Sequence, residues 1–146
     1  MDYQPDDEWM GKVFVHVATD DFAGLGSAWV GLQQLQDFAE ALKRHPLIAE
    51  EAAQFEVGYG GSLAGLTPAQ TLIRVTLRRY GPLGKVLVRA ELWAERDFSI
   101  SADHDLHQAV DARFLTDYAT IDRFASQLGA IVAGRSTQAR LEGAKG

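Results

Sequence analysis

The chain of 146 residues contains no cysteine. Without thiols it can form no disulfide and offers no thiolate as a nucleophile or metal ligand, so sites of those kinds are excluded. No apolar stretch approaches the roughly 18 residues that a membrane-spanning helix needs. The first ten residues, MDYQPDDEWM, are acidic and lack the apolar segment of a signal peptide. We therefore expect a cytoplasmic protein with no membrane partner.

Basic residues are fewer than acidic residues, and the formal net charge is −6. Residues 1–56 hold eleven acidic and three basic residues, whereas residues 57–146 hold nine acidic and eleven basic ones. Nucleic-acid-binding proteins usually carry a basic stripe, so no nucleic-acid partner is expected. An acidic surface attracts a basic partner over long distances. It also keeps a small protein soluble, and both interpretations stay open.

Two kinds of hydrophobic periodicity divide the chain. Alternation of apolar and polar residues, typical of half-buried strands, covers six segments. These segments are residues 12–19, 25–31, 53–60, 71–80, 85–95 and 107–115. Apolar residues three and four apart predict two amphipathic helices. The first begins at Leu32 and ends before Pro46, and the second is capped by Thr116 or Asp117 and ends at Gly134.

The order of these elements, ββαββββα, predicts an α+β fold. We expect an antiparallel sheet of about six strands with the two amphipathic helices on one face. The length suits a single domain, which we place at residues 11–134. Residues 1–10 are expected to form a polar N-terminal arm, and residues 135–146 a mobile C-terminal tail.

The sheet face that the helices leave open carries an unusual mixture of residues for a surface that contacts only water. Aromatic and arginine side chains are favoured at the centres of protein interfaces. We therefore predict a partner-binding surface made of Phe14, His16, Arg74, Arg89, Glu91 and Trp93. Two alternatives stay open. The charged residues could pair across strands, with Trp93 covered by the 96–106 loop, or the face could form a homodimer.

The segment SADHDLH concentrates groups that bind metals or move protons: Asp103, His104, Asp105 and His107. Imidazole and carboxylate ligands suit zinc, nickel, manganese or iron. However, the segment is predicted as a loop that runs into a strand, and no second cluster nearby completes a ligand set. A solvated loop is the favoured interpretation, and no catalytic, cofactor-binding or metal-binding residue is assigned.

The helices and the strands before them carry a family resemblance. The segments GSAWVGLQQLQDFAEALKRHPL and VDARFLTDYATIDRFASQLGAIV resemble those of small bacterial WapI-type immunity proteins and their uncharacterised relatives. The resemblance implies a protein that neutralises a toxin by binding it, without a catalytic step, and supplies no site residue. Both helices also share Phe, Ala and Leu at equal offsets; packing of both helices on one sheet is the favoured explanation, and duplication of a ββα unit is the alternative.

We therefore expect a non-enzymatic binding protein, of the immunity type found in toxin–antitoxin systems, whose partner is a basic toxin domain. One alternative is a small metal-binding or hydrolytic module that uses the 103–107 loop. The other is a structural homodimeric subunit.

Overall fold

The computed structural model describes residues 1–44, 52–59, 70–94 and 108–143. These residues form two antiparallel sheets and two helices, so the α+β class is confirmed. The three-stranded sheet has the order β1-β2-β3 and the four-stranded sheet the order β4-β5-β6-β7. The elements are β1 (Asp2–Pro5), β2 (Met10–Ala18), β3 (Ala23–Gly31), α1 (Leu32–Leu42), β4 (Ala53–Tyr59), β5 (Gln70–Tyr80), β6 (Lys85–Trp93), β7 (Ala109–Asp117) and α2 (Tyr118–Val132).

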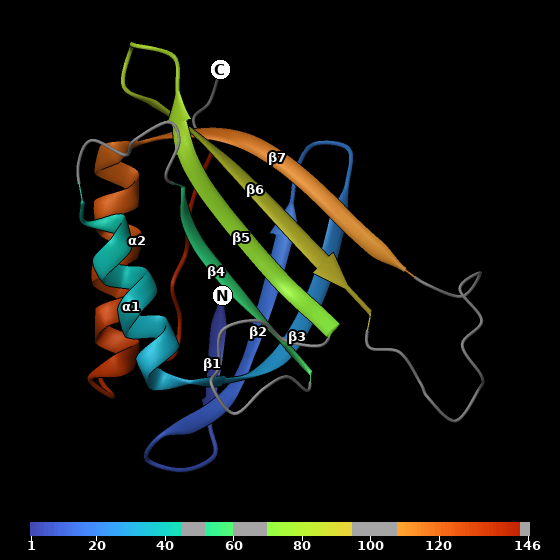
Figure 1. Ribbon diagram of the computed structural model, residues 1–146, viewed down its shortest axis with the longest axis vertical. Helices are drawn as coiled ribbons and strands as arrows, with labels where there is room; N and C mark the ends of the chain where they lie inside the picture. The colour runs from blue at the N-terminus through green and yellow to red at the C-terminus, as the bar shows by residue number, and fades with distance from the viewer. Residues whose placement is uncertain (45–51, 60–69, 95–107, 144–146) are drawn as a thin grey trace.

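Each helix follows a strand directly and is capped by a local hydrogen bond. At α1 the backbone N–H of Gly31 donates to the side-chain oxygen of Gln34 at 2.9 Å. At α2 the carboxylate of Asp117 accepts from the Thr120 backbone N–H at 2.8 Å, which identifies the cap that the sequence left open between two residues. The helices lie side by side at one end of the long strands (Figure 1).

Aromatic contacts join the helices to the four-stranded sheet. The ring of Phe38 in α1 stacks on Phe55 of β4, with centroids 5.3 Å apart. The same ring meets Phe124 of α2 edge to face at 6.3 Å. Such pairs add to the burial of the rings themselves. Phe38 therefore connects both helices to β4 at the centre of the core.

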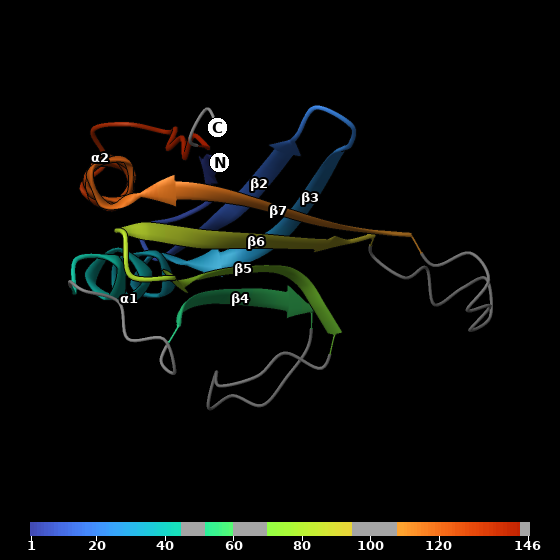
Figure 2. The same cartoon turned by 90° about the horizontal axis from the view of Figure 1, so that it is seen from above.

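The two sheets pack against each other through their apolar faces, which we call the inner faces. β3 crosses the four-stranded sheet and contacts β4, β5 and β6. Two glycines on the inner face of β3 permit this approach. A Cβ atom at Gly24 would lie 2.6 Å from a methyl group of Val110, and one at Gly26 would lie 3.2 Å from Leu92. Figure 2 shows β2 and β3 crossing the strands of the other sheet.

The expected single sheet of about six strands is therefore wrong. β3 and β4 belong to different sheets, and a short seventh strand, β1, precedes the rest. Alternation identifies the buried side of a strand but not its neighbour. The inner face of the four-stranded sheet is accordingly shared between the helices and the other sheet, rather than covered by the helices alone.

The terminal segments form part of the fold, contrary to the expected arm and tail. Tyr3 on β1 is buried, and its backbone N–H donates to the carbonyl of Thr137 at 2.8 Å. Ala139 is buried too, and its N–H donates to the carbonyl of Met1 at 2.9 Å. The hydroxyl of Thr116 donates to the carbonyl of Glu142 at 2.8 Å. The described part of the tail therefore pairs with β1 and with the end of β7.

The approach of β3 predicts a large cost for one added methyl group. We expect Gly24→Ala to lower the free energy of unfolding by about 1–3 kcal/mol, because the new Cβ overlaps Val110. Gly129→Ala is the matched control. It lies in α2 with no atom within 4 Å of the new Cβ, so it should raise stability by about 0.5–1 kcal/mol. Urea denaturation measures both, and equal effects would contradict this packing.

Candidate functional site

The outer face of the four-stranded sheet carries a row of paired charges. Arg74 of β5 and Glu91 of β6 are register partners. The guanidinium donates from Nε to Oε1 at 3.0 Å and from Nη2 to Oε2 at 2.9 Å. Its Nη1 lies 3.6 Å from Glu56 of β4. Arg74 therefore links three strands through one side chain.

Arg89 continues this row to the last strand. It donates to both carboxylate oxygens of Asp111 on β7, at 3.1 and 2.8 Å. Its Nε also lies 3.5 Å from Glu91. Glu91 and Asp111 are register partners, so the two carboxylates would repel each other without a cation between them. Arg113 adds a contact to Asp111 at 3.3 Å.

These contacts change the acidity of Asp111. Hydrogen bonding from Arg89, and then from Arg113, lowers the pKa of the Asp111 carboxyl from 3.8 to about 2. Donors to a carboxylate favour its charged form. We call the set Glu56, Arg74, Arg89, Glu91, Asp111 and Arg113 the ionic ladder.

Four of the six residues predicted to bind a partner lie on this face. The guanidinium carbon of Arg74 stands 5.3 Å from the ring centroid of Trp93, a cation–π contact. Arg74, Arg89 and Glu91 belong to the ladder. Their charged groups thus pair with one another, which is the cross-strand arrangement that the sequence left open. The 96–106 loop expected to cover Trp93 lies outside the described residues.

Phe14 and His16, the other two predicted residues, lie on the opposite side of the molecule. They belong to β2 of the three-stranded sheet, whose inner-face residues Val13, Val15 and Val17 are buried. Their side chains are therefore on the outer face of that sheet, with both inner faces between them and the ladder. The structure does not bring the six residues together.

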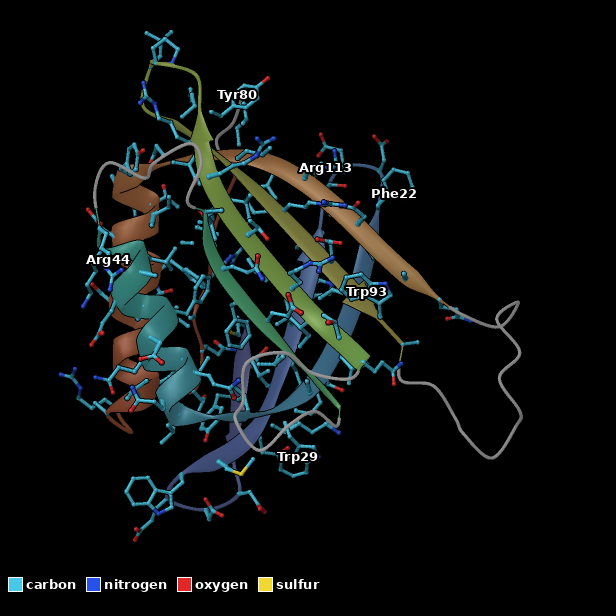
Figure 3. The ribbon with its side chains drawn as sticks, viewed as in Figure 1. Phe22, Trp29, Arg44, Tyr80, Trp93 and Arg113 are labelled. Carbon is cyan, nitrogen blue, oxygen red and sulfur yellow. The ribbon has the colours of Figure 1, made fainter. Side chains whose placement is uncertain are left out.

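The outer face of the three-stranded sheet and the turns at its ends instead carry a second group of large apolar side chains. Trp29 of β3 is 52% exposed and Leu25 is 68% exposed. Trp9 and Met10 lie where β2 begins, and Phe22 lies in the turn before β3. Figure 3 shows Phe22 and Trp29 towards opposite ends of β3. We call this set the aromatic surface: Trp9, Met10, Phe14, Phe22, Leu25 and Trp29.

Local hydrogen bonds hold the turns at both ends of the aromatic surface. The carboxylate of Asp7 accepts from the backbone N–H groups of Trp9 and Met10, both at 2.8 Å. At the other end the Thr19 backbone N–H donates to the carbonyl of Phe22 at 2.8 Å, and the Phe22 N–H donates to the Thr19 hydroxyl at 3.1 Å. The exposed rings are thus mounted on turns of defined geometry.

Acidic residues lie in the segments that carry these rings. They lie on β1, in the turn after it and in the turn after β2: Asp2, Asp6, Asp7, Glu8, Asp20 and Asp21. Among residues 1–31 the only cationic lysine or arginine is Lys12. Its ammonium lies 5.5 Å from the Phe14 ring centroid and 6.0 Å from that of Trp29. The surface therefore combines an apolar centre with an acidic rim.

Part of the aromatic surface was visible in the sequence. Trp29 stands between Ala28 and Val30, which are buried, so alternation alone places its ring outward. Trp9 and Phe22 lie in turns, where no periodicity reports which way a side chain points. Their exposure follows from the turn geometry, which a hydrophobic pattern does not describe.

The loop with Asp103, His104, Asp105 and His107 lies outside the described residues. Within residues 1–44, 52–59, 70–94 and 108–143, no group of three or more His, Asp or Glu residues could hold a metal ion. Over the same ranges no helix is long and apolar enough to cross a membrane.

Comparison with protein-family models, with curated proteins and with solved structures finds no match for this chain.

The ladder predicts unequal effects for two arginines. Arg74→Met leaves Glu91, whose side chain is only 7% exposed, without its two hydrogen bonds, so we expect a loss of about 2 kcal/mol in the free energy of unfolding. Arg113→Met breaks a solvent-exposed contact and should cost less than about 1 kcal/mol. Adding Glu91→Met to Arg74→Met should recover stability, because it removes a buried carboxylate that keeps only its 3.5 Å contact with Arg89. Calorimetry checks the order, and a larger loss for Arg113→Met would contradict it.

The lowered pKa of Asp111 predicts the acid sensitivity of the fold. Because the folded-state pKa lies below the ordinary value, the contribution of Asp111 is complete above about pH 4 and is lost as pH falls through about 2. Asp111→Asn should therefore flatten the decline of the unfolding free energy between pH 4 and pH 2. Arg89→Gln should flatten it more than Arg113→Gln does. A variant series with the slope of the parent protein would show that the pairing is absent in solution.

Proposed function

We propose that this chain is a non-enzymatic binding protein that docks a basic protein domain on the aromatic surface and occludes it. The observation that carries the proposal is the clustering of exposed apolar side chains. Trp9, Met10, Phe22, Leu25 and Trp29 are all at least 45% exposed, and all lie on the three-stranded sheet or its turns. Met10, Leu25 and Trp29 share the outer face of this sheet, and exposed apolar groups on one face of a protein are typical of an interaction site.

The side chains at the centre suit a protein interface. Tryptophan and other aromatic groups lose little conformational entropy on binding and remove much apolar area from water. Trp29 and Leu25 project from a paired strand, so their backbone positions are fixed before a partner arrives. Binding to such a surface needs little reordering, which favours affinity.

The acidic rim indicates the charge of the partner. Residues 1–31 hold six acidic residues and one lysine or arginine, Lys12, so the charge of this segment is negative. Complementary charge at a rim accelerates encounter and rejects partners of the same sign. Two copies of this chain would bring two acidic rims together, which disfavours a homodimer through this face. A basic domain would contact the apolar centre and complement the charge of the acidic rim.

The resemblance to immunity proteins supports the identity of that domain. On this proposal the partner is a bacterial toxin domain, and the chain neutralises it by covering a functional surface of the toxin. We place the activity in the cytoplasm, which the absence of cysteine fits. The ionic ladder has a structural role in this scheme, because its charged groups already satisfy one another.

The test is a complex with the basic domain encoded by the adjacent gene, measured by size-exclusion chromatography and titration calorimetry. Trp29→Ala with Leu25→Ser should weaken that complex at least about tenfold, because both side chains are exposed on the outer face of β3. Trp93→Ala is the matched control on the other sheet and should bind like the parent chain. Raising the salt concentration should slow association.

Three outcomes would contradict the proposal. The first is the failure of the adjacent basic domain to bind. The second is loss of binding with Trp93→Ala while the double variant binds normally, which would move the interface to the four-stranded sheet. The third is a concentration-dependent dimer in light scattering that Trp29→Ala with Leu25→Ser abolishes, which would make the surface a contact between copies of this chain.

A further inference from the structure

A pocket of about 560 Å³ lies between the two sheets, on the side of β2 that faces away from the aromatic surface. Its walls come from the inner faces of both sheets, from α2, and from Met1 and the C-terminal segment that contains Ala139 and Leu141. The apolar wall residues include Val15 and Val17 of β2, Val75 of β5, Val88 and Ala90 of β6, and Phe124 of α2. The volume falls within the range of about 300–1,000 Å³ found for small-molecule sites.

The close approach of β3 explains why the core is open here. At β3 the glycines bring the backbone against Leu92 and Val110, so no space remains. The next strand, β2, lines the pocket with Val15 and Val17, and β6 lines it with Val88 and Ala90. Val15, Val17 and Val75 keep 6–7% exposure, whereas Ile73 and Leu77 beside them on β5 have none. Residual exposure of core valines marks a pocket that opens to solvent.

The polar residues that line the pocket lie at its exposed edge. They are Thr19, Asp20, Arg113 and the amino terminus at Met1; His16 also borders the pocket, but its side chain lies on the outer face of β2. Figure 3 places Arg113 at the same end of the molecule as the turn that carries Phe22. Arg113 already contacts Asp111 at 3.3 Å, and the ammonium of Met1 and the carboxylate of Asp20 carry opposite charges, so these groups hold no excess of either sign. A charged head group would therefore meet charges of both signs around the pocket.

We propose that this pocket binds a small, uncharged, mostly apolar molecule with a single polar end, such as a medium-chain alcohol. The apolar body lies between Val15, Val17 and Ala90, out of water, and the polar end lies at the edge near Thr19. Each methylene removed from water contributes about 0.8 kcal/mol, and a neutral head group keeps its hydration at the open edge. This site is separate from the aromatic surface, because alternate residues of β2 face the two sides.

The test uses the neutral fluorophore N-phenyl-1-naphthylamine as the probe and the full chain as the protein. We expect saturable binding of one probe per chain, with displacement by decan-1-ol at lower concentration than by decanoate. Ala90→Leu places a larger side chain inside the pocket and should weaken probe binding at least tenfold. Val17→Phe fills the same space from the opposite sheet and should act alike if Ala90→Leu disturbs folding.

Two controls make the result specific. Ala109→Leu adds the same atoms on the exposed outer side of β7 and should leave probe affinity within twofold of the parent chain. Trp29→Ala removes the main ring of the aromatic surface and should also leave it unchanged. The proposal is overturned if the parent chain shows no saturable binding, if folded Ala90→Leu and Val17→Phe bind the probe normally, or if Trp29→Ala abolishes binding. Stronger displacement by decanoate than by decan-1-ol would overturn the assigned ligand class.

Discussion

The backbone contact between β3 and the four-stranded sheet is the constraint on which the rest of this structure depends. It exists because Gly24 and Gly26 have no side chains on the inner face, so β3 lies directly against Leu92 and Val110. This contact fixes the position of the three-stranded sheet over the other one. The same placement buries Val13, Val15 and Val17 and turns the alternate residues of β2 to solvent. One close approach thus determines the core, the pocket beside it and the outer aromatic surface.

The sequence predicted most elements of this fold but not their pairing. Six strands and both helices lie where periodicity placed them, because the buried side of each element leaves a clear spacing of apolar residues. The hydrophobic pattern does not reveal the division into two sheets, because β3 and β4 show the same alternation whether they belong to one sheet or to two. β1 escaped notice because four residues with Pro5 at the end are too few to show a period. The burial of Ala139 depends on a contact with residue 1, which no local pattern reports.

The candidate sites show the same difference between what periodicity predicts and what the pairing of strands determines. Arg74, Arg89, Glu91 and Trp93 lie on one face because alternation within β5 and β6 determines it. The prediction of a single sheet places Phe14 and His16 on that face too. It is wrong for these two residues because β2 belongs to the other sheet. Trp29 could have been found from its buried neighbours. The pocket could not, because its volume depends on the distance between two walls contributed by separate sheets. Sequence periodicity indicates which way a side chain points, whereas a cavity depends on the distance between its walls.

The pairing of β1 with residues 137–139 also bears on the order in which the molecule can assemble during its synthesis. A ribosome releases the early strands first, so β1 and β2 can form their ladder while the partner of the outer edge of β1 has not yet been made. Until then that edge presents unpaired amide and carbonyl groups, which are templates for association with another nascent chain. Closing a contact across more than 130 residues is slow compared with forming a hairpin. The last segment translated therefore pairs with the outer edge of β1, and a chain that stopped before residue 137 would leave that edge unpaired.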